Sequence, residues 1–267
     1  MVGAVSAVGD GGAGGPGDAV GAGAYLEALG PILARVGGQA DGPVQEAADL
    51  VVASLRAGGI VQAFGSGHSE ALAMELAGRA GGLVPTNRIA LRDLVVVGGE
   101  PADVLADPHL ERDPSIARRL YDLAAVSAAD VFVIGSNSGV NGSIVEFAQL
   151  VRQRGHRLVA ITSFAQTAAV DSRHPSGTKL IDHAHVALDN GAPYGDAVLP
   201  LPGGGAVCAV SSITGALLAQ LVGAEVVRRL LEDGEAPPVY LSANVPGGDE
   251  HNRILEDRYA GRIRRTA

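Results

Sequence analysis

Apolar residues in the first part of the chain recur every three or four positions, which is the spacing of one face of a helix. Two stretches have this pattern, 25–36 and 44–56. Each is followed within a few residues by two consecutive glycines, a common signal for the end of a helix. The sequence therefore predicts an opening pair of helices.

Further along, short continuous apolar runs alternate with stretches of helix-forming composition. The predicted strands are 60–64, 130–134, 157–161 and 185–188, and the predicted helices include 70–79 and 143–154. This alternation is typical of a parallel α/β sheet with right-handed crossovers. Such sheets bind ligands at the carboxyl ends of their strands. Polar residues follow each predicted strand, so we expect the functional site at that edge.

One later segment, 206–231, is long and apolar enough to raise the question of a membrane span. Four polar residues interrupt it, namely Ser211, Ser212, Gln220 and Glu225. We therefore favour a helix buried in the core or at a subunit contact, where small residues permit close packing, over a membrane span.

The two ends of the chain differ in composition from the rest. Residues 1–23 are rich in Gly and Ala, with little charge and no apolar run, so we expect a disordered tail that lacks the features of a signal peptide. Residues 24–267 are expected to form one domain. That domain ends with a Pro-Pro turn at 237–238, the segment 242–252 and a basic C-terminal helix ending in Arg262, Arg264 and Arg265.

Composition limits the class of partner. The chain has 267 residues, 47% of them hydrophobic and 18% charged, which is enough to bury one core. The formal net charge is −9, from 20 Lys and Arg against 29 Asp and Glu, so we expect neither nucleic acid nor a membrane surface as a partner. Cys208 is the only cysteine, which fits a reducing compartment, and we expect a cytoplasmic protein.

Two turns rich in Gly and Ser follow predicted strands and open predicted helices. They are 65–69, which reads GSGHS, and 135–142, which reads GSNSGVNG. In the second turn Ser136, Ser138 and Asn141 place short polar side chains at the positive end of a helix dipole, where backbone N–H groups also converge. This arrangement favours a phosphate site. An ordinary helix cap would use the same residue types.

The first turn strengthens the phosphate hypothesis, because two such turns on neighbouring strands would flank one crevice at a topological switch point. It has neither the GK[ST] of a Walker A loop nor the third glycine of a dinucleotide fingerprint, so nucleotide binding is disfavoured. The candidate residues for binding a sugar phosphate are Ser66, Gly67, Ser69, Ser136, Asn137, Ser138, Gly139, Asn141, Ser163, Glu250 and His251.

Three residues are candidates for proton transfer. Glu75 lies seven residues after His68, about two helical turns, so both side chains can face the same side. The carboxylate of Glu75 would act as a base, unless it forms a surface salt bridge with Arg79. His174, in the polar loop 171–179, would act as a general acid or base because imidazole titrates near neutral pH. The alternative for that loop is a solvated surface segment.

The remaining polar clusters allow more than one interpretation. Glu250 and His251 precede a predicted helix, so they either cap it or reach the site of a partner subunit. His183 and His185 stand at the start of a predicted strand, where alternation would place both imidazoles on one face. Zinc is disfavoured there, because the other histidines are scattered. We expect no metal and no other cofactor.

Several of these motifs resemble the SIS (sugar isomerase) domain family. GSGHS at 65–69, SNSGVN at 136–141 and ITS at 161–163 are similar to the family signature, whose phosphate loop reads Ser-x-Ser-Gly-x-Thr. Asn141 stands where Thr is usual. The likeness continues through HSEALAMELAGRAGGL at 68–83, SRHPSGTKL at 172–180 and SANVPGGDEHN at 242–252. The similar bacterial proteins lie close to a group that acts on N-acetylglucosamine 6-phosphate.

The resemblance implies a flavodoxin-like parallel sheet of five strands, a homodimer or larger homo-oligomer, and a crevice that holds a sugar phosphate on the SNSGVN loop. It leaves the activity open among aldose–ketose isomerases or epimerases, lyases and non-catalytic sensors. The sequence shows no helix-turn-helix of the kind that sensors carry, which favours an enzyme.

Our leading hypothesis is a dehydratase that eliminates water from an N-acetylhexosamine 6-phosphate, with N-acetylglucosamine 6-phosphate favoured. Glu75 would remove the C2 proton, and His68 or His174 would protonate the departing C3 hydroxyl. Isomerisation begins with the same proton abstraction and needs the same kind of base. The sequence therefore gives little basis for choosing between a dehydratase and an isomerase.

Overall fold

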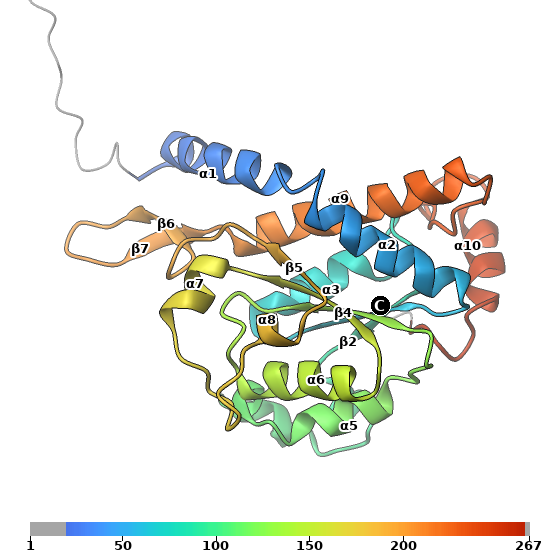
Figure 1. Cartoon of the computed structure of the whole chain (residues 1–267), viewed down its shortest axis with the longest axis horizontal. Coiled ribbons are helices and arrows are strands. Elements are labelled where there is room, and N and C mark those ends of the chain that lie inside the picture. Colours follow the sequence, from blue (N-terminus) through green and yellow to red (C-terminus); the bar gives the residue numbers. More distant parts are fainter. Residues whose placement is uncertain (1–19, 265–267) are drawn as a thin grey trace, which may run out of the picture.

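The short apolar runs of the chain form one parallel sheet, in which five strands lie in the order β2-β1-β3-β4-β5. The computed structural model in Figure 1 describes residues 20–264. The strands are β1 (Val61–Gly65), β2 (Thr86–Ile89), β3 (Val131–Gly135), β4 (Arg157–Thr162) and β5 (Val186–Asp189). Every neighbouring pair is parallel. The predicted α/β fold with a five-stranded parallel sheet is therefore confirmed.

Helices cover both faces of this sheet (Figure 1). One face packs against α1 (Ala22–Gly37), α2 (Pro43–Arg56), α3 (Glu70–Leu76) and α9 (Ser211–Glu232), and the other packs against α4 (Asp93–Val96), α5 (Ile116–Leu123), α6 (Gly142–Gln153) and α8 (Leu180–His183). Alternate residues of β3 enter the two cores: Val131 and Val133 enter the first, and Phe132 and Ile134 enter the second. This is the two-residue period of a strand buried on both faces.

Two β elements were not predicted from the sequence. The strand β2 has the polar sequence TNRI, and its Asn87 is tolerated at the sheet edge because its Nδ2 donates to Gln62 Oε1 at 2.8 Å. Residues 197–200 (β6) and 206–209 (β7) form an antiparallel hairpin. The predicted helix over 206–231 is therefore wrong at its start, because three glycines with left-handed φ precede β7 and turn the chain back.

The ends of the domain also differ from the predictions. The prediction of a tail over 1–23 falls mostly outside the described residues, and α1 already begins at Ala22. The last helix, α10 (Gly248–Asp257), ends before the arginines that were assigned to it. Arg262 and Arg264 instead reach back to the carboxylates of Asp130 and Asp93. The remaining helix, α7 (Phe164–Ala169), follows β4. Within residues 20–264 no helix is long and apolar enough to cross a membrane.

The amino end of the sheet is held together by the carboxylate of Asp130, whose side chain is fully buried. It accepts hydrogen bonds from Ile60 N at 3.0 Å, Gln62 Nε2 at 2.9 Å and Ser127 N at 3.0 Å. Arg262 Nη2 lies 2.6 Å from it and supplies the opposite charge. A buried charge is stable only with such partners, so this group fixes β1, β3 and the C-terminal segment to one another.

A buried histidine lies beside this group. His156 is 4% exposed; its Nε2 is 2.7 Å from the hydroxyl of Tyr121, and its Nδ1 is 3.2 Å from the carbonyl oxygen of Asp130. Since that carbonyl only accepts, Nδ1 carries the proton and Nε2 accepts from Tyr121. Burial lowers the pKa of His156 below the ordinary value of 6.5.

We expect Asp130→Ala to lower the free energy of unfolding by about 3 kcal/mol, because it removes the acceptor of three donors at this end of the sheet and leaves the partly buried guanidinium of Arg262 without its carboxylate. Asp122→Ala is the matched control, since Asp122 is an exposed partner of Arg118 and its loss should cost about 1 kcal/mol or less. Denaturant-induced unfolding measures both values. Equal losses in the two variants would contradict the structural role of Asp130.

Stability should also depend on the charge of His156. Because its pKa is lower in the folded chain than in the unfolded chain, the unfolded chain binds the proton more tightly, and stability is lost as the pH falls below about 6.5. His156→Gln should show a shallower decline of unfolding free energy between about pH 7.5 and about pH 5.5 than the unaltered protein. The prediction fails if the two declines are parallel.

Candidate functional site

The two Gly- and Ser-rich turns begin side by side, because Gly65 at the end of β1 pairs in register with Gly135 at the end of β3. Neither position leaves room for a side chain unless a neighbour shifts. A Cβ atom at Gly65 would lie less than 3.0 Å from the carbonyl oxygen of Ser69, and one at Gly135 less than 3.0 Å from the side chain of Leu72. The first turn and α3 therefore lie directly against the two central strands.

The turns line one cleft of about 720 Å³ at the carboxyl edge of the sheet. This edge lies on the left of Figure 1, beside α7 and the hairpin β6–β7. The predicted residues that line the cleft are Ser66, Gly67, His68, Ser69, Ser136, Asn137, Ser138 and Asn141. The structure thus brings together the two turns that the sequence had placed on neighbouring strands.

The carbonyl oxygens of the second turn are bound from behind. The carbonyl of Asn137 accepts from Ser163 N at 3.1 Å, and that of Ser138 accepts from Thr167 Oγ1 at 3.0 Å. The carbonyl of Gly139 accepts from Leu180 N at 2.8 Å, and that of Val140 accepts from Arg173 N at 3.0 Å. The four carbonyls of residues 137–140 are therefore satisfied by α7 and its cap, by α8 or by the loop before α8.

The N–H groups of the same turn are in the opposite situation. Within the described part of the chain, the N–H groups of Asn137, Ser138, Val140 and Asn141 have no acceptor. Gly139 is the exception: its N–H donates to Ser136 Oγ at 3.1 Å, and its positive φ of 66° requires glycine. Asn141 opens α6 without capping it through its side chain. A turn with satisfied carbonyls and open N–H groups at a helix start is suited to an anion.

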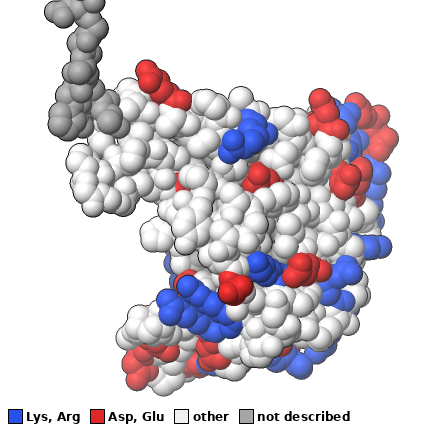
Figure 2. Space-filling model, turned by 60° about the vertical axis from the view of Figure 1, so that its left-hand side comes forward, with Lys and Arg blue, Asp and Glu red and all other residues white. Residues whose placement is uncertain are grey.

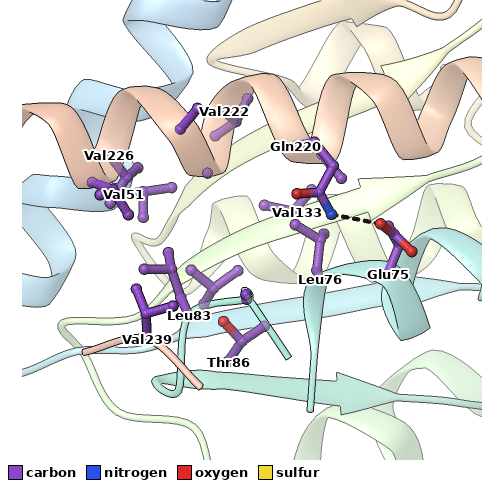
Figure 3. Close-up of a pocket in the computed structure, with 17 residues that line it drawn as sticks. Val51, Glu75, Leu76, Leu83, Thr86, Val133, Gln220, Val222, Val226 and Val239 are labelled. Atoms are coloured by element: carbon purple, nitrogen blue, oxygen red, sulfur yellow. Dashed lines mark hydrogen bonds between the residues drawn. The ribbon is translucent and has the colours of Figure 1, made fainter. Parts of the chain in front are cut away.

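The predicted base, Glu75, does not line this cleft. It lies on α3 one helical turn beyond Leu72, which contacts the floor of the cleft at Gly135. Figure 3 shows its carboxylate beside Gln220 of α9, whose Nε2 donates to it at 2.5 Å, at the end of a separate apolar cavity of about 310 Å³. Glu75 also pairs with Arg79, as the alternative interpretation expected.

Five other predicted residues lie outside the cleft lining. Gly139 lies beneath it, and Ser163 caps α7, accepting from Gln166 N at 3.0 Å and donating to the carbonyl oxygen of Ala192 at 2.6 Å. Glu250 forms an exposed ion pair with Arg253, and His251 Nε2 lies 3.0 Å from the carbonyl oxygen of Val239. His174 is buried and lies 2.7 Å from Glu146 Oε2.

The histidine pair that raised the question of zinc is divided between two elements. His183 ends α8, and its Nε2 lies 2.8 Å from Thr178 Oγ1. His185 precedes β5 and accepts from Leu158 N at 3.0 Å. The prediction that a strand places both rings on one face is therefore wrong. Residues 20–264 contain no group of three or more His, Cys, Asp or Glu side chains arranged to hold a metal ion.

Several residues that line the cleft were missed. They are Glu111, Gln166, Gly195, Asp196, Ala209, Ser211 and Ser212. The two serines open α9 after a Gly-rich stretch, which is the same signal that identified the other two turns. No sequence motif pointed to Glu111, because it lies in a short 3₁₀ turn, Leu110–Arg112, outside the predicted strands and Gly-rich turns.

The two missed carboxylates have different surroundings. Asp196 accepts from Val210 N at 3.1 Å and from Ser211 N at 2.8 Å, and it also accepts from the Ser211 hydroxyl at 2.6 Å. It therefore holds the start of α9 in place. Glu111 accepts only from Ser66 Oγ, at 3.3 Å. Of the carboxylates that line the described cleft, Glu111 is the one free to take a proton.

Few charges surround the cleft. No Lys or Arg side chain is among the described residues that line it. Figure 2 turns the carboxyl edge toward the viewer. Charged side chains gather mainly along the right-hand side and the lower part of this face, while much of its left-hand side and middle is uncharged. The lining itself therefore offers an anion only local hydrogen bonds and the helix dipole.

The chain is similar to known proteins in sequence and in fold. Residues 24–163 match the SIS domain. A UPF0309 protein of Listeria monocytogenes is 39% identical over 224 residues, 82% of this chain and 89% of that protein, and one of Brucella canis is 39% identical over 235 residues, 86% of this chain and 94% of that protein. The structure of a phosphoheptose isomerase from Francisella tularensis has a TM-score of 0.52 at 12% identity, over 78% of this chain and 100% of that one.

We expect Gly65→Ala to be destabilising by about 1–3 kcal/mol, because its new methyl group would overlap the carbonyl oxygen of Ser69. Gly30→Ala is the control, since no atom lies within 4 Å of a Cβ added at that exposed position of α1, and alanine favours a helix over glycine by about 0.5–1 kcal/mol. Unfolding free energies of both variants test the close approach. A Gly65→Ala protein as stable as the unaltered chain would contradict it.

Proposed function

Because the chain belongs to the SIS-domain family, we propose that it is an enzyme that binds a phosphorylated sugar in this cleft and removes the proton from C2. One observation carries the proposal: in the turn 136–141 the carbonyls of residues 137–140 are bound from behind, while four of the N–H groups of the turn have no acceptor within the described residues. A phosphate group accepts several such N–H bonds at a helix start.

The phosphate would lie on the second turn, with the sugar extending over the first. Ser138 and Asn141 supply side-chain groups to the phosphate, and the N–H groups between them supply the rest. The sugar then lies among His68, Ser69 and the two serines that open α9, all of which line the same cleft. Short polar side chains of this kind suit the hydroxyl groups of a sugar.

The geometry favours Glu111 over Glu75 as the base. A base must come within hydrogen-bond reach of the proton that it removes. Glu111 lines the cleft and makes one weak contact, with Ser66. Glu75 lies beyond Leu72 and is bound by Gln220 and Arg79. We therefore assign the base to Glu111 and retain Glu75 as the rival in the experiment.

The favoured reaction is elimination from the open-chain form of N-acetylglucosamine 6-phosphate. The aldehyde at C1 acidifies the C2–H bond, and the base takes this proton. The electron pair forms a C2–C3 double bond as the C3–O bond breaks, and His68 protonates the departing hydroxyl to give water. An aldose–ketose isomerase would start with the same abstraction and return a proton to C1, while an epimerase would return it to C2.

The proposed enzyme is a homodimer or a larger homo-oligomer. Large apolar side chains are exposed on its N-terminal helix and on α9: Leu26 is 67% exposed, Ile213 43% and Leu231 59%. Exposed apolar side chains on two helices that pack against each other support a contact with a second copy.

We expect proton NMR in heavy water to show loss of the C3 proton pattern of N-acetylglucosamine 6-phosphate and a new alkene signal. Deuterium exchange at C2 without net product would keep the proton abstraction but would assign an epimerase or an isomerase of another sugar. Absence of both exchange and binding would overturn the proposed function.

In the same assay Glu111→Gln should lower turnover or exchange by about 10²-fold or more while leaving affinity for the sugar phosphate nearly unchanged. Glu75→Gln and the exposed control Glu27→Gln should retain most of the rate. Loss of the rate in Glu75→Gln with full activity in Glu111→Gln would return the role of base to Glu75.

A further inference from the structure

The charges that line the cleft oppose the binding of an anion. The described lining contains the carboxylates Glu111 and Asp196 and no Lys or Arg. The single lysine of the chain, Lys179, donates to the carbonyl oxygen of Thr167 at 2.6 Å, behind the second turn. Hydrogen bonds from neutral N–H groups are weaker than those assisted by a charge. A cation close to the second turn would therefore strengthen the binding of a phosphate group.

Arg173 is placed to supply this charge. Its Nη1 donates to Asn141 Oδ1 at 3.1 Å, and Asn141 both lines the cleft and opens α6. The guanidinium is exposed and forms no ion pair with a carboxylate among the described residues. The guanidinium thus lies at the edge of the second turn, and no carboxylate in the described part of the chain compensates its charge.

The contact also decides which way the amide of Asn141 faces. A guanidinium carries only donors, so the atom that faces Arg173 must be the oxygen Oδ1. The Nδ2 group of Asn141 then points away from Arg173, and no acceptor binds it within residues 20–264. Without Arg173 the amide could rotate and present its oxygen to the cleft, where it would repel an anion.

The segment that carries Arg173 is fixed at its backbone. Arg173 N donates to the carbonyl oxygen of Val140 at 3.0 Å. The next residue, His174, is buried and lies 2.7 Å from Glu146 Oε2 on α6 and 2.7 Å from Ser176 Oγ. These contacts hold Arg173 over the start of α6, so a predicted acid–base histidine serves as an anchor for the segment.

We propose that Arg173 is a positioning residue for the phosphate group, which orients the amide of Asn141 so that Nδ2 donates into the cleft and adds positive charge beside the turn. The proposal deepens the proposed function and rests on it. It also accounts for Asn141, which stands where the resembling motif usually has Thr. A threonine hydroxyl can rotate to donate by itself, whereas an asparagine amide needs a neighbour that selects its donor side.

The test measures binding of two probes, inorganic phosphate and N-acetylglucosamine 6-phosphate, by calorimetry at low salt. Arg173→Ala should raise the Kd of both by about tenfold, while the backbone bond from residue 173 remains. Arg118→Ala, which removes another exposed arginine from an ion pair on α5, should leave both values unchanged. Unfolding curves should show that both variants stay folded.

A second comparison separates orientation of Asn141 from a general loss of structure. Asn141→Thr should bind phosphate nearly as well as the unaltered protein, and adding Arg173→Ala to it should cost less than the tenfold expected in the Asn141 background. Arg173→Lys should bind more tightly than Arg173→Ala, because lysine keeps both a hydrogen-bond donor and a positive charge. Weak binding of N-acetylglucosamine without phosphate should not change in any variant.

The outcomes distinguish the two proposals. If the unaltered protein binds both probes and Arg173→Ala binds them equally well, or if Arg118→Ala loses as much affinity, the role of Arg173 is wrong and the proposed function stands. If inorganic phosphate binds in an Arg173-dependent way but the sugar phosphate is neither bound nor altered, the role of Arg173 stands and the proposed sugar is wrong. Failure to bind either probe overturns both.

Discussion

The site depends on the close approach of α3 to the two central strands. At Gly65 and Gly135 the absence of a side chain lets the turn 67–69 and Leu72 lie against the ends of β1 and β3. Since these glycines are paired in register, the two polar turns begin at the same height and open toward the same cleft. A larger residue at either strand end would separate the turns.

The open N–H groups of the second turn, on which the proposed phosphate site rests, come from contacts behind the turn. Its carbonyl groups are held by Ser163, Thr167, Arg173 and Leu180, which belong to the segment between β4 and β5. Because those donors bind the carbonyls of residues 137–140 from one side, the N–H groups remain for a ligand. The proposed phosphate site therefore needs no lysine in its lining, although the chain has a net charge of −9.

The carboxylates of the domain have separate tasks. Asp196 fixes the start of α9 through three hydrogen bonds, and Asp130 holds the opposite end of the sheet. Glu75 is engaged by Gln220 and Arg79 beyond the floor of the cleft. Of the carboxylates that line the described cleft, Glu111 has the fewest hydrogen-bond partners, with a single contact to Ser66. This favours Glu111 as the base in the chemistry that we propose.

The sequence by itself determined the parallel α/β fold, four of the five strands of the sheet and the two turns of the cleft, because apolar runs and Gly/Ser turns are local signals. It did not reveal β2, whose polar Asn87 is stabilised by Gln62 from a neighbouring strand. Nor did it place Glu111, Asp196 or Arg173 at the site, or keep Glu75 and His174 out of the cleft. Those outcomes depend on which distant segments meet at the sheet edge, and only the packing of the folded chain decides that.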